Sequence, residues 1–159
     1  MMKVAVVGIG QSLRGDDAAG LMAIQLWQEK YPETAGSPEV QVESDELPGL
    51  ALLDMLEGVD VAILVDAVHS SAAPGTIHRL NENDLSAFAS DAKSAHGWGV
   101  AETLNMGRLL GKTGNAFIRL IGIEAKQMTL GMGLSKTIQE TIPLVCEAIQ
   151  KEVESHLVK

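Results

Sequence analysis

Three polar side chains along this chain have the types and positions that could hold a metal ion. Asp17 lies in a glycine-rich loop, and Asp66 directly follows the apolar run 61–65. His96 lies in a short loop further along the chain. Two carboxylates and an imidazole suit a divalent ion of borderline softness, such as Zn²⁺ or Ni²⁺, and leave coordination positions open for a substrate. The sequence therefore predicts a metal-assisted site built from these residues.

The first loop, residues 8–17, differs in sequence from a nucleotide-binding turn. A glycine-rich turn between a strand and a helix usually binds phosphate, because free backbone N–H groups at the helix start favour an anion. Here Asp16 and Asp17 stand at that position and would repel a phosphate. The dinucleotide fingerprint is also incomplete, since Gly8 and Gly10 are present but Leu13 replaces the third glycine. The loop is better suited to a cation or a polar substrate.

Each candidate residue also has a structural interpretation. An aspartate at a helix start is most often a cap that accepts backbone N–H groups. A cap alone would explain Asp16. For Asp17, the cap and the metal-ligand role have even weight. Asp66 is harder to explain in this way, because an aspartate that closes an apolar strand needs a partner or a function. A lone histidine such as His96 is more often a hydrogen-bonded or surface residue than a ligand. His69, close to Asp66, is a reserve ligand.

The composition excludes several classes of partner. The chain has 159 residues, enough for one well-buried core, so we expect a single domain over 1–159. Its net charge of −9 argues against nucleic acid and anionic membranes as partners. No apolar run approaches the roughly 20 residues that span a bilayer, and we expect no leader ahead of the first strand. The single cysteine, Cys146, suits a reducing compartment, so we expect a cytoplasmic protein.

The elements that must position the site alternate between strands and helices. Nearly continuous apolar runs are typical of central parallel strands that are covered on both faces. Pro74-Gly75 turns the chain back, so the following strand is expected at an antiparallel edge. The fold class is therefore α/β, a three-layer α/β/α sandwich with a mostly parallel twisted sheet, in which ligands bind beyond the carboxyl ends of the strands. Strands are expected at 3–8, 39–43, 61–67, 75–80 and 116–123, and helices at 17–30, 48–57, 83–89, 99–110 and 135–156.

Four motifs in order give the chain a family resemblance that runs from Val4 to about Ile149. It resembles the hydrogenase maturation proteases, the endopeptidases that trim the large subunit of nickel–iron hydrogenases. The matching segments are Gly8-Ile9-Gly10 with Arg14-Gly15-Asp16-Asp17, Val65-Asp66-Ala67 with Pro74-Gly75-Thr76, His96 ahead of Gly99 and Leu104, and Gly122-Ile123 with Gly131-Met132-Gly133-Leu134-Ser135.

The resemblance implies a role for each site residue. Family members bind nickel through positions that match Asp17, Asp66 and His96, and the nickel is the one already inserted into the substrate. The implied activity is cleavage of the C-terminal extension from the nickel-loaded large-subunit precursor, with Asp17 and Asp66 as the catalytic residues. The chain departs from the family pattern at Gln11 and in the segment 44–49, where many members carry an Asp-Gly-Gly-Thr sequence.

Two other functions and two mechanisms remain open at this point. The same three residues would serve a non-cleaving chaperone or binding module that senses the nickel-loaded subunit. A flavodoxin-like nucleotide-binding domain is a third interpretation. In a protease, the water could be polarised by the metal, or Asp17 or Asp66 could act as the general base.

Overall fold

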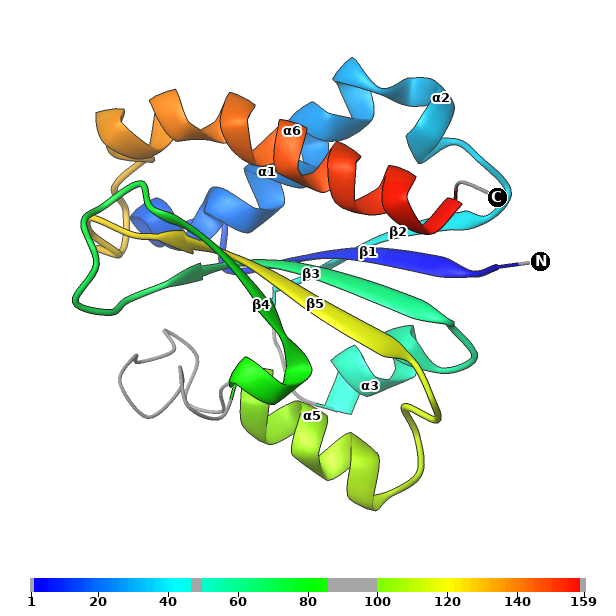
Figure 1. Cartoon of the computed structure of the whole chain (residues 1–159). Helices are drawn as coiled ribbons and strands as arrows, with labels where there is room; N and C mark the ends of the chain where they lie inside the picture. Colours follow the sequence, from blue (N-terminus) through cyan, green and yellow to red (C-terminus); the bar gives the residue numbers. More distant parts are fainter. Residues whose placement is uncertain (1, 47–49, 86–99, 158–159) are drawn as a thin grey trace.

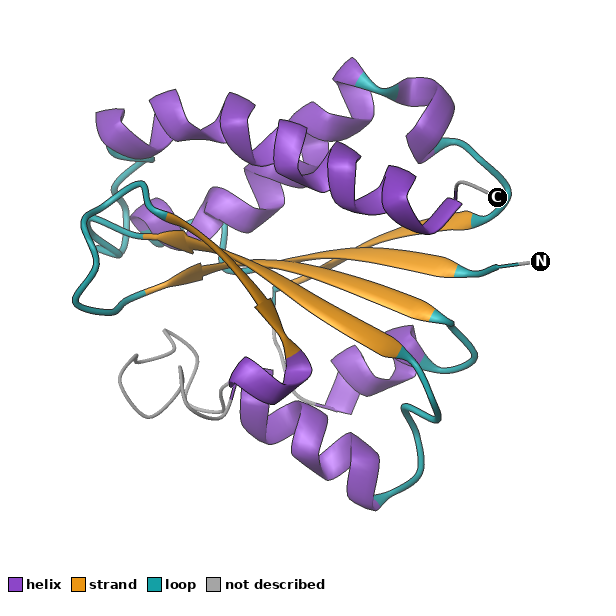
Figure 2. Ribbon diagram, in the orientation of Figure 1, coloured by secondary structure: helices purple, strands orange, loops and turns teal. Residues whose placement is uncertain are grey.

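A parallel sheet with one antiparallel edge strand forms the middle layer of the molecule. The computed structural model describes residues 2–46, 50–85 and 100–157, and helices cover both faces of the sheet (Figures 1 and 2). Within these ranges the strand order is β2-β1-β3-β5-β4, with β4 antiparallel to β5 and the other neighbours parallel. The α/β sandwich with an antiparallel edge strand is therefore confirmed. The strands are β1 (Val4–Ile9), β2 (Val40–Asp45), β3 (Val61–Val68), β4 (Ile77–Asn81) and β5 (Phe117–Glu124).

The helices divide between the two faces. One face carries α1, α2 and α6, and the other carries α3 and α5 (Figure 1). A short 3₁₀ turn, η1, leads into α1. None of the helices in the described ranges is long and apolar enough to cross a membrane. The bounds are η1 (Gly15–Ala18), α1 (Ala19–Lys30), α2 (Pro32–Ala35), α3 (Leu50–Leu56), α5 (Val100–Leu109) and α6 (Lys136–Leu157).

The alternation of side chains along the central strands produces two separate cores. Val4 and Val6 face α1 and α6, whereas Ala5 and Val7 face α3 and α5. Since every residue of β1 and β3 is buried, both faces of these strands are covered, as the apolar runs predict.

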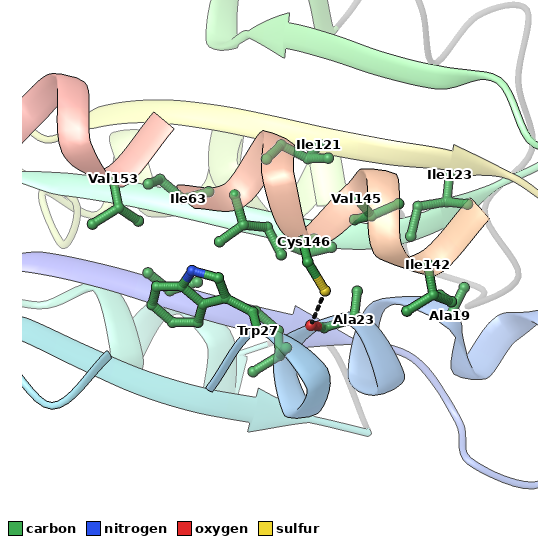
Figure 3. Close-up of a cluster of buried hydrophobic side chains, with 14 of the residues drawn as sticks. Ala19, Ala23, Trp27, Ile63, Ile121, Ile123, Ile142, Val145, Cys146 and Val153 are labelled. Atoms are coloured by element: carbon green, nitrogen blue, oxygen red, sulfur yellow. Dashed lines mark hydrogen bonds between the residues drawn. The ribbon is translucent and has the colours of Figure 1, made fainter. Parts of the chain in front are cut away.

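The core between the sheet and the α1–α6 pair contains two polar contacts. The indole Nε1 of Trp27 donates to Gln150 at 2.9 Å. The Cys146 thiol donates to the Ala23 carbonyl at 3.4 Å, the contact marked in Figure 3. Burial raises the pKa of the Cys146 thiol to about 11. This cysteine is therefore a packing residue and not a nucleophile.

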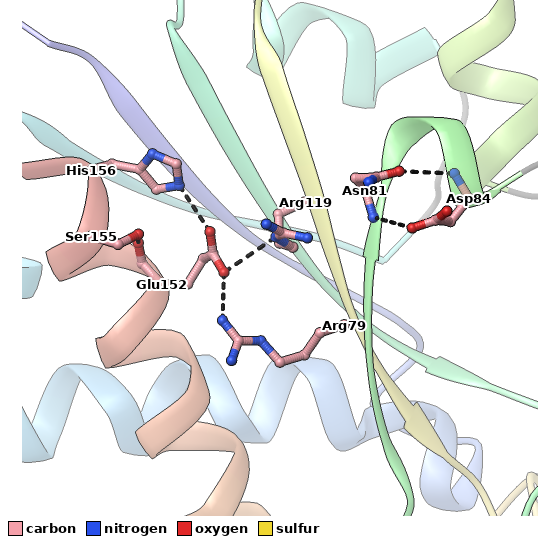
Figure 4. Close-up of polar contacts among 7 residues, drawn as sticks. All are labelled: Arg79, Asn81, Asp84, Arg119, Glu152, Ser155 and His156. Atoms are coloured by element: carbon pink, nitrogen blue, oxygen red, sulfur yellow. Dashed lines mark hydrogen bonds and ion pairs between the residues drawn. The ribbon is translucent and has the colours of Figure 1, made fainter.

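A buried carboxylate ties α6 to the edge of the sheet. Glu152 accepts hydrogen bonds from Arg79 at 2.8 Å and pairs with Arg119 at 3.2 Å and His156 at 2.8 Å (Figure 4). Burial alone would raise the pKa of Glu152, but the hydrogen bonds from Arg79 and His156 and the charge of Arg119 outweigh it and hold the pKa below its ordinary value. The cluster fastens the C-terminal half of α6 to β4 and β5.

The expected elements agree with the structure to within about two residues at most boundaries. The helix expected at 83–89 falls mostly outside the described residues. The short α2 was not predicted, because its four residues carry no apolar period and only Pro32 marks its start. Pro143 lies inside α6, which continues past it to Leu157.

Candidate functional site

A row of residues crosses the carboxyl edge of the parallel strands. In the register of the sheet, Ile9 at the end of β1 faces Asp45 on one side and Asp66 on the other, and Asp66 faces Gly122 of β5. Both aspartates are buried, with 5% and 3% of their surface exposed. Neighbouring strands lie about 4.8 Å apart, so the Cα atoms of the two aspartates are roughly 10 Å apart. The edge therefore presents two carboxylates beneath the first loop.

Side-chain alternation places Asp66 on the same face of the sheet as α3 and α5. Ala62 and Leu64 belong to the core on that face, and Asp66 continues the period of two. The side chain therefore leaves the sheet toward the face on which α5 begins at Val100.

The first loop brings Asp17 to this edge. Asp17 is fully buried in η1, and its Oδ2 accepts the backbone N–H of Gln11 at 3.0 Å. The turn requires a glycine at position 10, because φ there is +149° and a Cβ would lie 2.0 Å from the Asp17 carbonyl oxygen. The hydrogen bond and the close backbone contact fix the Asp17 carboxylate over the end of β1.

A second glycine sets the distance between α1 and the sheet. A Cβ on Gly20 would lie 2.3 Å from the carbonyl oxygen of Val65 and 2.8 Å from that of Ile9. The start of α1 therefore packs directly against β1 and β3. Its contact on β3 is Val65, the residue before Asp66. Asp17 and Asp66, which are 49 positions apart in the sequence, reach the same edge of the sheet through this contact.

The third predicted ligand, His96, lies outside the described residues. The convergence of Asp17, Asp66 and His96 on one metal ion therefore stays a prediction. Within 2–46, 50–85 and 100–157, no group of three histidine, cysteine, aspartate or glutamate side chains is placed to hold a metal. His69, the reserve ligand, is exposed next to the end of β3.

Asp16 has a different role from the helix cap expected for it. Its carboxylate caps neither η1 nor α1. Instead its oxygens accept the backbone N–H groups of Lys126 at 2.9 Å and Gln127 at 3.0 Å, and both the N–H and the hydroxyl of Ser135. The fully buried Asp16 carboxylate thus holds the loop between β5 and α6 against the first loop.

A further carboxylate at the same edge escaped the sequence analysis. Glu124, the last residue of β5, accepts hydrogen bonds from the N–H and hydroxyl of Ser70 and contacts His78 Nε2 at 3.0 Å. Burial alone would raise its pKa, but the bonds from Ser70 and His78 outweigh burial and lower it. Glu124 stabilises the turn between β3 and β4. Its signal in the sequence was the same as that of Asp66, an acid that closes an apolar strand.

Comparison with known proteins identifies the family. The sequence pattern of the hydrogenase maturation protease family matches residues 47–152, more than half of the chain. The chain belongs to this family. The resemblance predicted from the four motifs is thereby confirmed.

Two relatives show how far the similarity to this protease extends. This chain is 29% identical over 142 residues to the hydrogenase expression/formation protein HupD of Thiocapsa roseopersicina, and the match covers 88% of this chain and 62% of HupD. It is 26% identical over 151 residues to the hydrogenase 2 maturation protease of Escherichia coli, covering 93% of this chain and 88% of that relative.

Solved structures agree with the protease fold. The [NiFe] hydrogenase maturation protease HybD from Thermococcus kodakarensis superposes with a TM-score of 0.79 at 26% identity, covering 96% of this chain and 99% of HybD. The hydrogenase maturating endopeptidase HybD from E. coli has a TM-score of 0.84 at 23% identity, covering 99% and 96% of the two chains. The second likeness supports the sandwich fold alone.

Proposed function

We propose that this protease removes the C-terminal extension of a nickel-loaded nickel–iron hydrogenase large-subunit precursor. The observation that carries the proposal is the placement of two buried carboxylates, Asp17 and Asp66, at one edge of the sheet by Gly10 and Gly20. Membership of the family supplies the reaction class, peptide-bond hydrolysis.

The proposed site recognises the nickel that the precursor already holds. Carboxylate oxygens and an imidazole are ligands that nickel accepts, and we assign them to Asp17, Asp66 and His96. A precursor without nickel would lose these contacts and would be held in the wrong place. The site thus checks the metal before the chain is cut.

The chemistry assigned to the aspartates is general base catalysis. One carboxylate, Asp17 or Asp66, takes a proton from the attacking water, whose oxygen bonds to the carbonyl carbon of the scissile peptide. The carbon–nitrogen bond then breaks, and the proton passes to the departing amine of the extension. When bound in the precursor, nickel can also act as a Lewis acid toward the water or the carbonyl.

We also propose that the reaction takes place in the cytoplasm, with the precursor as the protein partner. The single cysteine is a buried thiol, which suits a reducing compartment. The net charge of −9 disfavours nucleic acid and anionic membranes as partners.

A cleavage assay tests this function against the non-cleaving alternative. Nickel-loaded and nickel-free precursor are each incubated with the purified protease, and the products are weighed by mass spectrometry. We expect the extension to be released from the nickel-loaded precursor only. Intact nickel-loaded precursor that co-purifies with the protein would instead support a binding module or chaperone.

A further inference from the structure

Two loops at the carboxyl edge of the sheet are hydrogen-bonded to one another. The N–H of Gly131 donates to the Leu13 carbonyl at 2.8 Å, and the N–H of Gly15 donates to the Met132 carbonyl at 3.0 Å. The Asp16 carboxylate adds its bonds to the second loop. We call residues 11–15 and 126–135 the paired loops. They form one surface beside the proposed catalytic residues, at the left end of the sheet in Figure 1.

The paired loops expose three large apolar side chains. Leu13 and Leu130 are 71% and 72% exposed, and Met132 is 55% exposed. Single exposed apolar residues are ordinary on a protein surface. Here the three belong to two loops that are held together by backbone hydrogen bonds, so they form a set that we call the apolar rim. A partner that covered the apolar rim would remove its surface from water.

Arg14 lies next to this rim and differs from the other arginines of the chain. Its side chain is half-buried, and its Nε atom is buried with no hydrogen-bond partner among the described residues. No ion pair of Arg14 occurs among the residues that the structure describes. The buried Nε is out of reach of a ligand, so a bound carboxylate would pair with the exposed part of this half-buried guanidinium side chain. Each of the other arginines pairs with a glutamate: Arg79 and Arg119 with Glu152, and Arg108 with Glu82.

Charged side chains of both signs lie at the paired loops. Lys126 begins the second loop and Lys136 follows it; both are exposed, and neither forms an ion pair within the described ranges. The acids at the first loop are the buried Asp16 and Asp17 and the exposed Glu46, which accepts the N–H and the hydroxyl of Ser12. Among the cations, Arg14 follows Leu13 of the apolar rim and shares a turn with Asp17, so it is the one placed to pair with a carboxylate of a partner.

We propose that Arg14 and the apolar rim bind the precursor segment that is cut, with the guanidinium pairing with a carboxylate of that segment. This inference rests on the proposed function. Arg14 and Asp17 share a turn in which the Asp17 N–H donates to the Arg14 carbonyl at 3.0 Å. A peptide bond placed at Asp17 and Asp66 must therefore have its flanking residues near the paired loops. Arginine suits this role because its planar fork matches a carboxylate.

Kinetics of cleavage with matched variants test the proposal. Arg14→Gln should raise KM for the nickel-loaded precursor about tenfold while kcat changes by less than about twofold, because the lost contact binds the substrate and takes no part in the chemistry. The double variant Leu13→Ser, Met132→Ser should also raise KM. The control variants Lys151→Gln on α6 and Leu109→Ser at the end of α5 remove an exposed charge and an exposed leucine far from the paired loops, and should keep the parent KM.

The partner carboxylate is identified by a double-mutant cycle. Each aspartate and glutamate of the precursor around the cut is replaced by its amide and assayed with the parent protease and with Arg14→Gln. We expect one replacement to raise KM for the parent about tenfold and to have little further effect with Arg14→Gln. An unchanged KM for Arg14→Gln, or no coupled carboxylate, would overturn the inference. A parent protease that releases no extension would instead refute the proposed function itself.

Discussion

Asp16 holds Ser135 by two hydrogen bonds, although the two residues are 119 positions apart. Oδ1 accepts the Ser135 backbone N–H at 2.7 Å and Oδ2 accepts its hydroxyl at 2.8 Å. The same carboxylate accepts two further N–H groups, those of Lys126 and Gln127 at the start of the second loop. The residue beside the proposed catalytic Asp17 is thus a structural clamp, and the two adjacent aspartates have different roles.

Asp16→Asn should destabilise the protein by about 1–3 kcal/mol, because the amide turns one acceptor into a donor that faces other donors. Ser135→Ala should cost only about 0.5–1.5 kcal/mol, since the backbone bond to Asp16 remains. Urea unfolding of the two variants measures both values. Equal stability of Asp16→Asn and the parent would contradict the clamp.

Gly20→Ala tests the contact that brings the first loop to β3. The added Cβ would lie 2.3 Å from the Val65 carbonyl oxygen, so α1 must move away from the sheet. We expect a loss of about 2–4 kcal/mol. Gly133→Ala is the matched control, because its Cβ meets no atom within 4 Å and its φ is not in the left-handed region, and it should change stability by less than about 0.5 kcal/mol. Equal melting temperatures for the two variants would contradict the close approach of α1 to the sheet.

The sequence predicted the fold well because its signals were local. The apolar runs of β1 and β3 and the turn at Pro74-Gly75 are readable in single segments, and they determine the layers and the antiparallel edge. The role of Asp16 could not be read in this way, because its partners lie more than a hundred residues away. The bond between Glu124 and Ser70 spans 54 positions and could not be read locally either, although Glu124 itself closes an apolar strand as Asp66 does.

Asp45 was missed for a different reason. Asp45 is the last residue of β2, a strand that is only partly buried and alternates apolar and polar residues, so no apolar run drew attention to its end. Only the pairing of β1 with β2 reveals that Asp45 and Asp66 lie on the two sides of Ile9. Register between strands is a tertiary property, and hydrophobic pattern alone determines it weakly.

The Glu152 cluster makes stability depend on pH in the acid range. The folded pKa of Glu152 lies below its ordinary value of 4.5, so its contribution is complete above that value and is lost as pH falls through the folded pKa. Near neutral pH, Glu152→Gln should be less stable than the parent by about 1–3 kcal/mol, and the difference should shrink below pH 4.5. Glu154→Gln, on the exposed side of the same helix, is the control. A difference that grows on acidification would contradict the assignment.

The free protease should bind nickel weakly. Three proposed ligands are fewer than a closed structural site provides, and the precursor must keep its own metal when the product leaves. Calorimetric titration of the purified protein with Ni²⁺ should give weak binding that a chelator removes. Stoichiometric nickel that survives chelator treatment would show that the protease has a resident metal and would contradict recognition of the precursor's ion.

Asp66→Asn tests the central claim most directly, because it keeps the shape of the side chain and removes its charge. The variant and the parent are compared by urea unfolding and by mass spectrometry of nickel-loaded precursor after incubation. We predict that stability changes by no more than about 1 kcal/mol, whereas release of the C-terminal extension is lost, since a neutral amide is a poor nickel ligand and a poor base. Retained cleavage together with a stability loss of roughly 1–3 kcal/mol would contradict the account and would make Asp66 a structural residue.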